Sequence, residues 1–73
     1  MVELKINFAV QLKTLRTQKG LTQQQVAEIV SVNKPHVSNW ESGRNVPLLP
    51  VLWQLADYFQ CSLDFLVGRS DTP

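Results

Sequence analysis

The 73-residue sequence has little of what catalysis or metal binding requires: one cysteine, one histidine and three glycines. Cys61 has no partner for a disulfide or a CxxC metal motif, so we expect a small apolar residue in a reducing compartment. A single histidine supplies no pair of imidazole ligands, and the glycines form no loop that could cradle a phosphate. HExxH motifs and spacings typical of Ser/His/Asp or Cys/His sets are missing as well. The sequence therefore predicts no enzyme, no metal and no cofactor.

Long apolar runs are also missing. No run approaches the ~20 residues of a membrane span, and no signal peptide is visible, so we expect a cytoplasmic protein with no membrane partner. The hydrophobic content of 44% and charged content of 18% are typical of a globular chain. A single domain of this length gains only about 3–5 kcal/mol from its core, so it needs near-ideal packing or a partner subunit.

The net charge of +1 does not by itself indicate a partner. Its distribution is more informative. Residues 1–44 hold six Lys or Arg against three Glu, for a charge of +3, whereas residues 45–73 hold Arg69 against three Asp, for −2. The basic half suits nucleic acid, and a scatter of solubilising surface charges explains it equally well.

Apolar spacing predicts five short helices and no interior strand. The first covers residues 7–19, with Asn7 as a possible cap, and ends at Gly20. Residues 1–6 precede it as an extended N-terminal arm, because Val2, Leu4 and Ile6 alternate with polar residues.

Capping signals delimit the next two helices. Thr22 and Gln25 have the spacing of a capping box at the start of the second helix. Residues 31–33 form a turn, Asn33 caps the third helix and Gly43 ends it. Two helices joined by so short a turn form a helix-turn-helix unit, whose second helix can enter the DNA major groove.

The fourth and fifth helices cover residues 49–59 and 63–67, and a polar tail follows at 69–73. Ser62 caps the fifth helix and Gly68 ends it. Residues expected to face the core from the fourth helix are Leu49, Leu52, Ala56 and Phe59.

The third helix has a long polar face. Val37 and Trp40 lie together on one side, and the opposite side carries Pro35, Ser38, Asn39 and Ser42, with no carboxylate. Short donors and acceptors without negative charge suit a groove lined by phosphates and base edges. An ordinary solvated helix face is the alternative.

Taken in order, these motifs resemble the lambda-repressor-like, Xre-type (Cro/cI) helix-turn-helix domain over about residues 8–70. The residues that carry the resemblance are Leu12-Lys13-x-Leu15-Arg16-x-x-Lys19-Gly20-Leu21-Thr22-Gln23-x-x-Val26-Ala27, Val32-Asn33-x-x-x-Val37-Ser38-x-Trp40-Glu41-x-Gly43-Arg44-x-x-Pro47, Leu52-x-x-Leu55-Ala56 and Ser62-Leu63-Asp64-x-Leu66-x-Gly68. The resemblance implies a compact all-α, five-helix domain that binds double-stranded DNA at a near-palindromic operator. It also implies a transcriptional repressor that acts as a homodimer.

The resemblance also implies roles for individual residues. Base contacts fall to Lys34, Pro35, Ser38 and Asn39. Phosphate contacts fall to Gln23, Asn33, His36, Ser42, Gly43 and Arg44. Arg16 and Glu41 match an ion pair that ties the first helix to the third. Caps, turn residues and unconnected surface charges are the alternatives.

Two positions depart from the family pattern. Ser31 stands in the turn where glycine is frequent, so a positive φ there would be strained. Leu48 stands where a polar cap is usual, which leaves the fourth helix poorly capped.

The fourth helix also carries a second apolar stripe, which comprises Leu48, Val51, Leu55 and Tyr58. The stripe is either covered by the N-terminal arm or the fifth helix, or it forms the dimer interface. A dimer would place two recognition helices about 34 Å apart on the DNA.

Other functions remain open on the sequence alone. An antitoxin or a protein-interaction module could use the same fold. The sequence does not distinguish a phage repressor from a host regulator, or a whole small regulator from an N-terminal piece, and it does not give the operator. It shows no sign of a small-molecule ligand.

Overall fold

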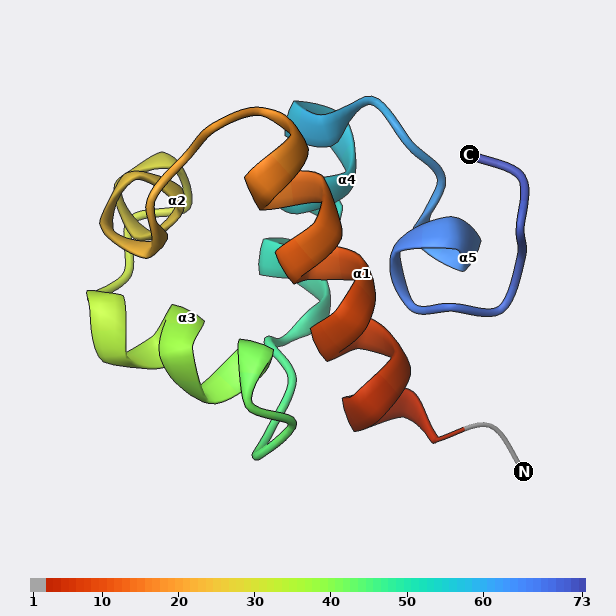
Figure 1. The fold of residues 1–73 in the computed structure, drawn as a ribbon, viewed down its shortest axis with the longest axis horizontal. Coiled ribbons are helices and arrows are strands. Elements are labelled where there is room, and N and C mark those ends of the chain that lie inside the picture. The colour runs from red at the N-terminus through yellow and green to blue at the C-terminus, as the bar shows by residue number, and fades with distance from the viewer. Residues whose placement is uncertain (1–2) are drawn as a thin grey trace.

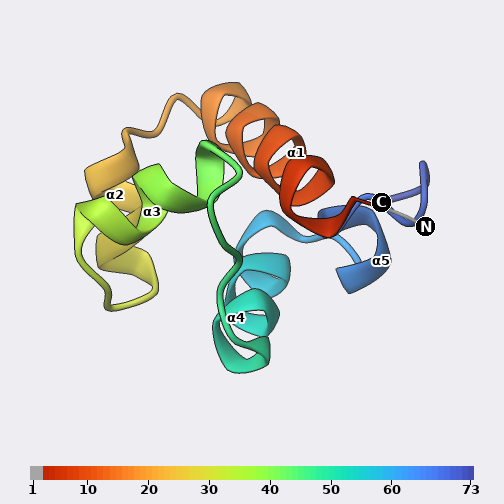
Figure 2. The same ribbon diagram turned by 90° about the horizontal axis from the view of Figure 1, so that it is seen from below.

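The computed structural model describes residues 3–73, and these form five α-helices without a strand. The helices are α1 (Leu4–Gln18), α2 (Gln23–Ile29), α3 (Lys34–Glu41), α4 (Leu49–Phe59) and α5 (Leu63–Leu66). α1 runs through the middle of the molecule, with α2 and α3 towards one side and α5 and the C-terminus towards the other (Figures 1 and 2). This arrangement confirms the predicted all-α, five-helix fold.

α1 begins earlier than the sequence predicts. The helix starts at Leu4 rather than at residue 7, and the Asn7 N–H donates to the Glu3 carbonyl at 2.9 Å, so Asn7 is not the cap. Residues 4–6 of the expected extended arm are therefore helical. A period-two alternation of three residues is too short a signal to outweigh the helical stripe that follows it. Met1 and Val2 of the expected arm lie outside the described residues.

All five helices contribute to one hydrophobic core. The buried residues of this core are Phe8, Leu12, Val26, Ala27, Val30, Val37, Trp40, Leu55, Ala56, Phe59 and Leu66. Fully burying a large apolar side chain contributes about 1.5–3 kcal/mol. Each short helix supplies only one to three of these buried side chains. Each helix is therefore stable only when its side chains pack against those of the other helices.

The predicted caps mostly form as expected. Thr22 and Gln25 make both hydrogen bonds of a capping box, and the Ser62 hydroxyl accepts from the Phe65 N–H at 3.0 Å. Asn33 occupies the N-cap position of α3 without a side-chain cap bond. Leu48 precedes α4 without such a bond, which confirms that this helix lacks a polar cap.

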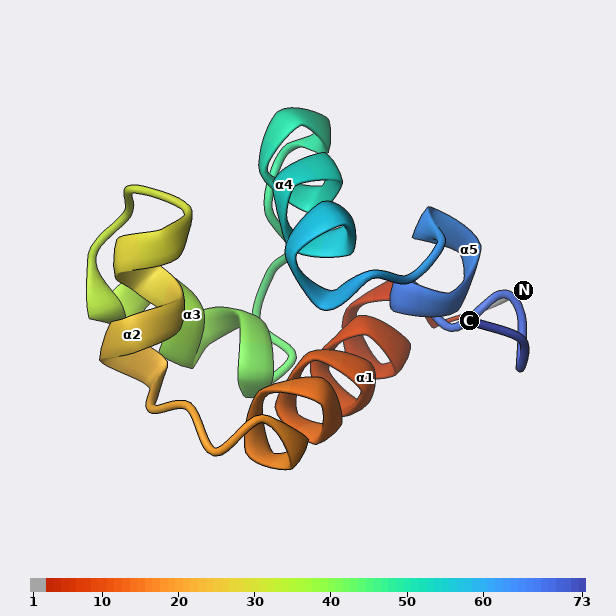
Figure 3. The same cartoon turned by 90° about the horizontal axis from the view of Figure 1, so that it is seen from above.

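α4 has the predicted bounds but turns a different side inward. Leu55, Ala56 and Phe59 are buried, whereas Leu49, predicted to face the core, is 60% exposed and Leu52 is half-buried. Figure 3 shows the reason: the first turns of α4 extend away from α1, so the fully buried residues of the helix all lie in its second half.

A side-chain hydrogen bond from the middle of α1 ties this helix to α5. The Gln11 side-chain amide donates to the Phe65 carbonyl at 2.9 Å. The tail folds back over the start of α5, where the Ser62 N–H donates to the Pro73 carbonyl at 3.0 Å. α1 thus contacts α3 with one part of its length and α5 with another.

Candidate nucleic-acid interface

The turn between α2 and α3 is closed by backbone hydrogen bonds to the end of α2. Ser31 has a φ of 59°. The sequence predicts strain at this position if φ is positive, because serine stands where glycine is frequent in the family. Its N–H donates to the Glu28 carbonyl at 3.3 Å, and the Val32 N–H donates to the Ala27 carbonyl at 2.9 Å. This hydrogen-bond pair is the Schellman motif that closes many helix ends, here with serine at the left-handed position.

α3 turns its polar side away from the core. Val37 and Trp40 are buried. The predicted base-contacting residues lie on the outer side: Lys34, Pro35 and Ser38 are exposed and Asn39 is half-buried. The structure therefore brings these four side chains together on one helix of eight residues.

The residues predicted to contact phosphates border this face. Asn33, His36, Ser42 and Arg44 are exposed, whereas Gln23 and Gly43 are half-buried. The His36 ring lies 6.5 Å from the Trp40 ring, centroid to centroid. The Ser42 hydroxyl donates to the Asn39 carbonyl at 3.0 Å, so it reaches a phosphate only as an acceptor or by breaking this bond. Asn33, His36 and Arg44 make no side-chain hydrogen bond within residues 3–73 that would compete with such a contact.

The predicted ion pair between α1 and α3 is present. Arg16 Nε donates to Glu41 Oε2 at 2.6 Å and Arg16 Nη2 donates to Glu41 Oε1 at 3.0 Å, a two-point contact between the two planar groups. Arg16 Nη1 also donates to the Leu21 carbonyl at 2.8 Å. The side chains are only 13% and 4% exposed, so the pair lies largely out of water.

Gln23 makes a contact that the sequence did not predict. Its side-chain nitrogen donates to Glu41 Oε1 at 3.0 Å, which links the start of α2 to the end of α3. Spacing along the chain gives no signal for this bond, because the two residues are 18 positions apart and belong to different helices.

The predicted dimer stripe on α4 is not a continuous surface. Leu55 is completely buried in the core, so it cannot contact a second subunit, and Val51 packs half-buried against the same core. Leu48 is 79% exposed. Tyr58 is exposed too, but the Lys19 ammonium lies over its ring, 5.6 Å from the centroid.

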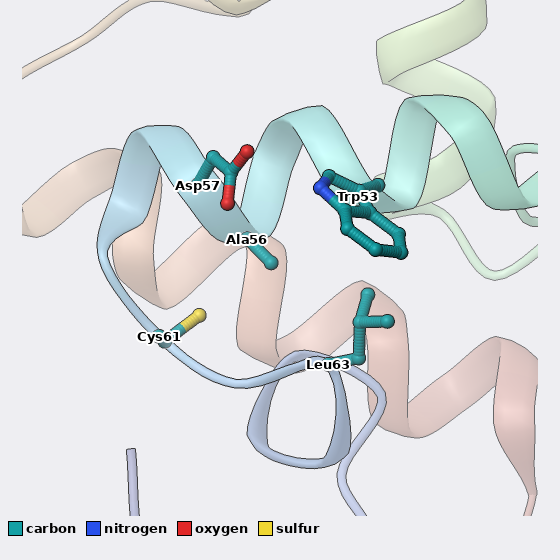
Figure 4. Close-up of a pocket in the computed structure, with 5 residues that line it drawn as sticks. All are labelled: Trp53, Ala56, Asp57, Cys61 and Leu63. Atoms are coloured by element: carbon teal, nitrogen blue, oxygen red, sulfur yellow. The ribbon is translucent and has the colours of Figure 1, made fainter.

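The most exposed apolar side chains of α4 and its N-cap are instead Leu48, Leu49 and Trp53, and we call these three residues the α4 patch. Figure 4 shows the Trp53 indole beside a hollow that Ala56, Asp57, Cys61 and Leu63 complete. The hollow has a volume of about 200 Å³. The spacing of Leu49 and Trp53, four residues apart, was the sequence signal for this surface.

Cys61 lies between α4 and α5, half-buried against the core. Burial raises the pKa of its thiol above the ordinary value of 9.0, because the thiolate is poorly solvated there. The side chain therefore packs as a small, protonated apolar group rather than a reactive nucleophile.

Two further features of residues 3–73 bear on other kinds of site. In that range no group of three or more His, Cys, Asp or Glu side chains could hold a metal ion. None of the helices described there is both long and apolar enough to cross a membrane.

Curated transcriptional regulators are similar to this chain in sequence. The chain is 37% identical over 66 residues to the HTH-type transcriptional activator BcrR of Enterococcus faecalis, an alignment that covers 90% of this chain and 32% of BcrR. The chain therefore spans about a third of the length of that relative. It is similarly 36% identical over 58 residues to the HTH-type transcriptional regulator AnsR of Bacillus subtilis, with coverage of 80% and 50%.

Solved structures match the fold closely. A transcriptional regulator from Listeria innocua superposes with a TM-score of 0.83 at 36% identity, covering 90% of this chain and 62% of that one. Residues 12–66 of the sequence match the family model HTH_3, described as helix-turn-helix. With its paired α2 and α3 and its polar, outward-facing α3, the chain belongs to the HTH_3 family of lambda-repressor-like, Xre-type helix-turn-helix domains.

Proposed function

We propose that this chain binds double-stranded DNA in a sequence-specific manner, with α3 in the major groove. One observation carries the proposal above the others: the outer side of α3 presents short polar groups and Lys34 but no free carboxylate. The Glu41 carboxylate at the end of this helix is paired with Arg16 instead. A helix surface of this kind can approach phosphates without charge repulsion.

Each base-reading residue has a distinct role in the proposal. The Lys34 ammonium donates to guanine O6 or N7, and the Asn39 amide pairs with adenine. Pro35 has no N–H to donate, so its ring meets a thymine methyl, and the Ser38 hydroxyl donates or accepts. Gln23, Asn33, His36, Ser42, Gly43 and Arg44 contact the flanking phosphates.

Selection of bound duplexes from random DNA tests the proposal, followed by titration of a recovered duplex at several salt concentrations. Each phosphate contact should add about 0.9 to the slope of log affinity against log salt. Lys34→Ala and Asn39→Ala should each weaken binding by roughly 5- to 100-fold. Lys5→Ala, which removes an exposed lysine from α1, is the matched control. Failure to enrich any sequence would contradict specific binding.

The proposal includes a homodimer on a near-palindromic operator. The α4 patch is the surface it uses, because a two-fold axis buries the same exposed apolar residues of both copies against each other. Large aromatic residues such as Trp53 are enriched at the centres of such interfaces.

Two matched variants test the dimer by sedimentation. Trp53 is 59% exposed on α4 and Ile6 is 58% exposed on α1, so both accept a charge without entering the core. Trp53→Glu should give a folded monomer, and Ile6→Glu should leave the mass of the assembly unchanged. Equal masses for the two variants would contradict the use of the α4 patch.

The regulatory outcome we propose is repression, in which the bound dimer occupies an operator that overlaps a promoter. The E. faecalis relative is described as an activator, so a reporter gene under the selected operator decides the sign. Repression predicts lower expression when the chain is present and recovery with Asn39→Ala. The proposal places the protein in the cytoplasm, where Cys61 stays reduced.

A further inference from the structure

The Glu41 carboxylate collects hydrogen bonds from two other helical segments. Two come from the Arg16 guanidinium, at 2.6 and 3.0 Å, and one comes from the Gln23 amide nitrogen, at 3.0 Å. The Glu41 side chain is 4% exposed. The guanidinium cancels its charge where water cannot, so the carboxylate presents little net field to the protein surface nearby.

This arrangement fixes the orientation of the Gln23 amide. An ionised carboxylate accepts hydrogen bonds and donates none, so only the amide nitrogen of Gln23 can face Glu41. The carboxylate partner thus determines which atom of the Gln23 amide is nitrogen and which is oxygen. A neutral partner that both donates and accepts would not determine this assignment. The nitrogen carries two hydrogens, and Glu41 takes one of them. The second meets no acceptor in the hydrogen bonds of residues 3–73, and Gln23 is only half-buried.

We propose that Glu41 is a positioning residue that holds the Gln23 nitrogen in place to donate its second hydrogen to a DNA phosphate. The inference deepens the proposed function and rests on it. The amide nitrogen would then bridge two acceptors, the Glu41 carboxylate and the phosphate. Arg16 makes the bridge possible, because without its charge the carboxylate would repel the phosphate.

A second Gln–Glu pair in α2 provides an internal comparison. The Gln24 amide nitrogen donates to Glu28 at 3.2 Å, four residues along the same exposed helix face. No Arg or Lys pairs with Glu28 within the described residues 3–73. This pair is open to water, so its amide should exchange and rotate freely, whereas that of Gln23 should not.

Side-chain amide NMR on the free protein tests the positioning directly. The Gln23 amide hydrogen that is bonded to Glu41 should exchange with solvent at least about fivefold more slowly than the Gln24 hydrogen that is bonded to Glu28. Glu41→Ala removes the acceptor but leaves Arg16 unpaired and can unfold the domain. Arg16→Met/Glu41→Met removes both charges together and keeps the volume filled, which preserves folding in comparable cases. Loss of Gln23 protection in this double variant supports the proposal, and equal protection of Gln23 and Gln24 in the wild type overturns it.

Binding measurements on a selected duplex test the consequence for DNA. Gln23→Ala should weaken binding about tenfold in the wild-type background and less than about twofold in the Arg16→Met/Glu41→Met background. An equal loss in both backgrounds overturns the positioning role while leaving DNA binding intact. A wild-type protein that binds no duplex overturns the proposed function, and with it the phosphate contact.

Discussion

Replacing Gly68 by alanine would test the close approach between α1 and the end of α5. A Cβ built at Gly68 would lie 2.5 Å from the Asn7 Cβ and 3.1 Å from its Cγ. Gly68 also has a φ of +83°, which residues with a side chain rarely adopt. The substitution therefore carries two separate costs, one in the backbone and one in the contact with α1.

The size of each cost follows from its cause. The left-handed backbone costs about 1–2 kcal/mol, offset by about 0.4–1 kcal/mol because alanine lowers the entropy of the unfolded chain. The contact is far inside the ~3.5–4.0 Å optimum between carbons. The Asn7 Cβ cannot rotate away, so α1 or the tail must shift, at about 1–3 kcal/mol. Together these costs approach the whole stability of about 3–5 kcal/mol expected at this size.

Urea unfolding followed by circular dichroism measures the loss. Gly20→Ala is the control, because Gly20 has a φ of +69° and a Cβ added there would meet nothing within 4 Å. It should lose only the backbone part, about 1 kcal/mol, or about 4–8 °C of melting temperature. Asn7→Gly should recover part of the loss in Gly68→Ala. If Gly68→Ala is no less stable than Gly20→Ala, the close approach between Gly68 and Asn7 does not lower the stability of the alanine variant, contrary to this prediction.

Four further predictions concern stability. Leu55→Ala should lower the free energy of unfolding in urea by about 2–5 kcal/mol because Leu55 is fully buried. A loss below about 1 kcal/mol would indicate that Leu55 lies at the surface instead. Ser31→Gly should gain roughly 0.5 kcal/mol by relieving its positive φ, and any lower melting temperature would argue against strain. Thr22→Ala should cost about 1 kcal/mol through loss of the capping box, visible in the same melts. Because the pKa of Cys61 is raised on folding, stability should fall as pH rises past about 9, and Cys61→Ala should remove this part of the pH dependence.

Signals that act within a few residues made most of the helices predictable. Thr22 and Gln25 fix the start of α2 through bonds between neighbours, and Ser62 does the same for α5. Local signals do not explain every helix start. α4 begins at Leu49, as predicted, although Leu48 provides no side-chain cap; apolar residues along the helix pack against the core instead.

Features that depend on distant parts of the chain could not be predicted. Which side of α4 faces inward depends on where α1 and α5 lie, so the sequence pattern puts Leu55 on the surface and Leu49 in the core, the reverse of their positions. The left-handed Gln60, with a φ of 55°, is a local exception: its turn is closed by hydrogen bonds to α4, but no glycine marks the position in the sequence. The Gln23–Glu41 bond likewise exists only once α2 and α3 are docked.

α1 is one continuous helix that links α3 to α5, and this link would matter for the proposed dimer. Gln11 of α1 donates a hydrogen bond to α5, and Arg16 of α1 donates to α3. The two residues are five positions apart on this helix, which corresponds to a rise of about 7.5 Å along its axis. A dimer formed through α4 would therefore hold its two recognition helices at a set distance and rotation. One extra base pair between half-sites turns the second by about 34–36°, and without a hinge in α1 the protein would have to bend or twist the DNA to follow. Operator spacing would then discriminate between DNA sites in addition to the bases themselves.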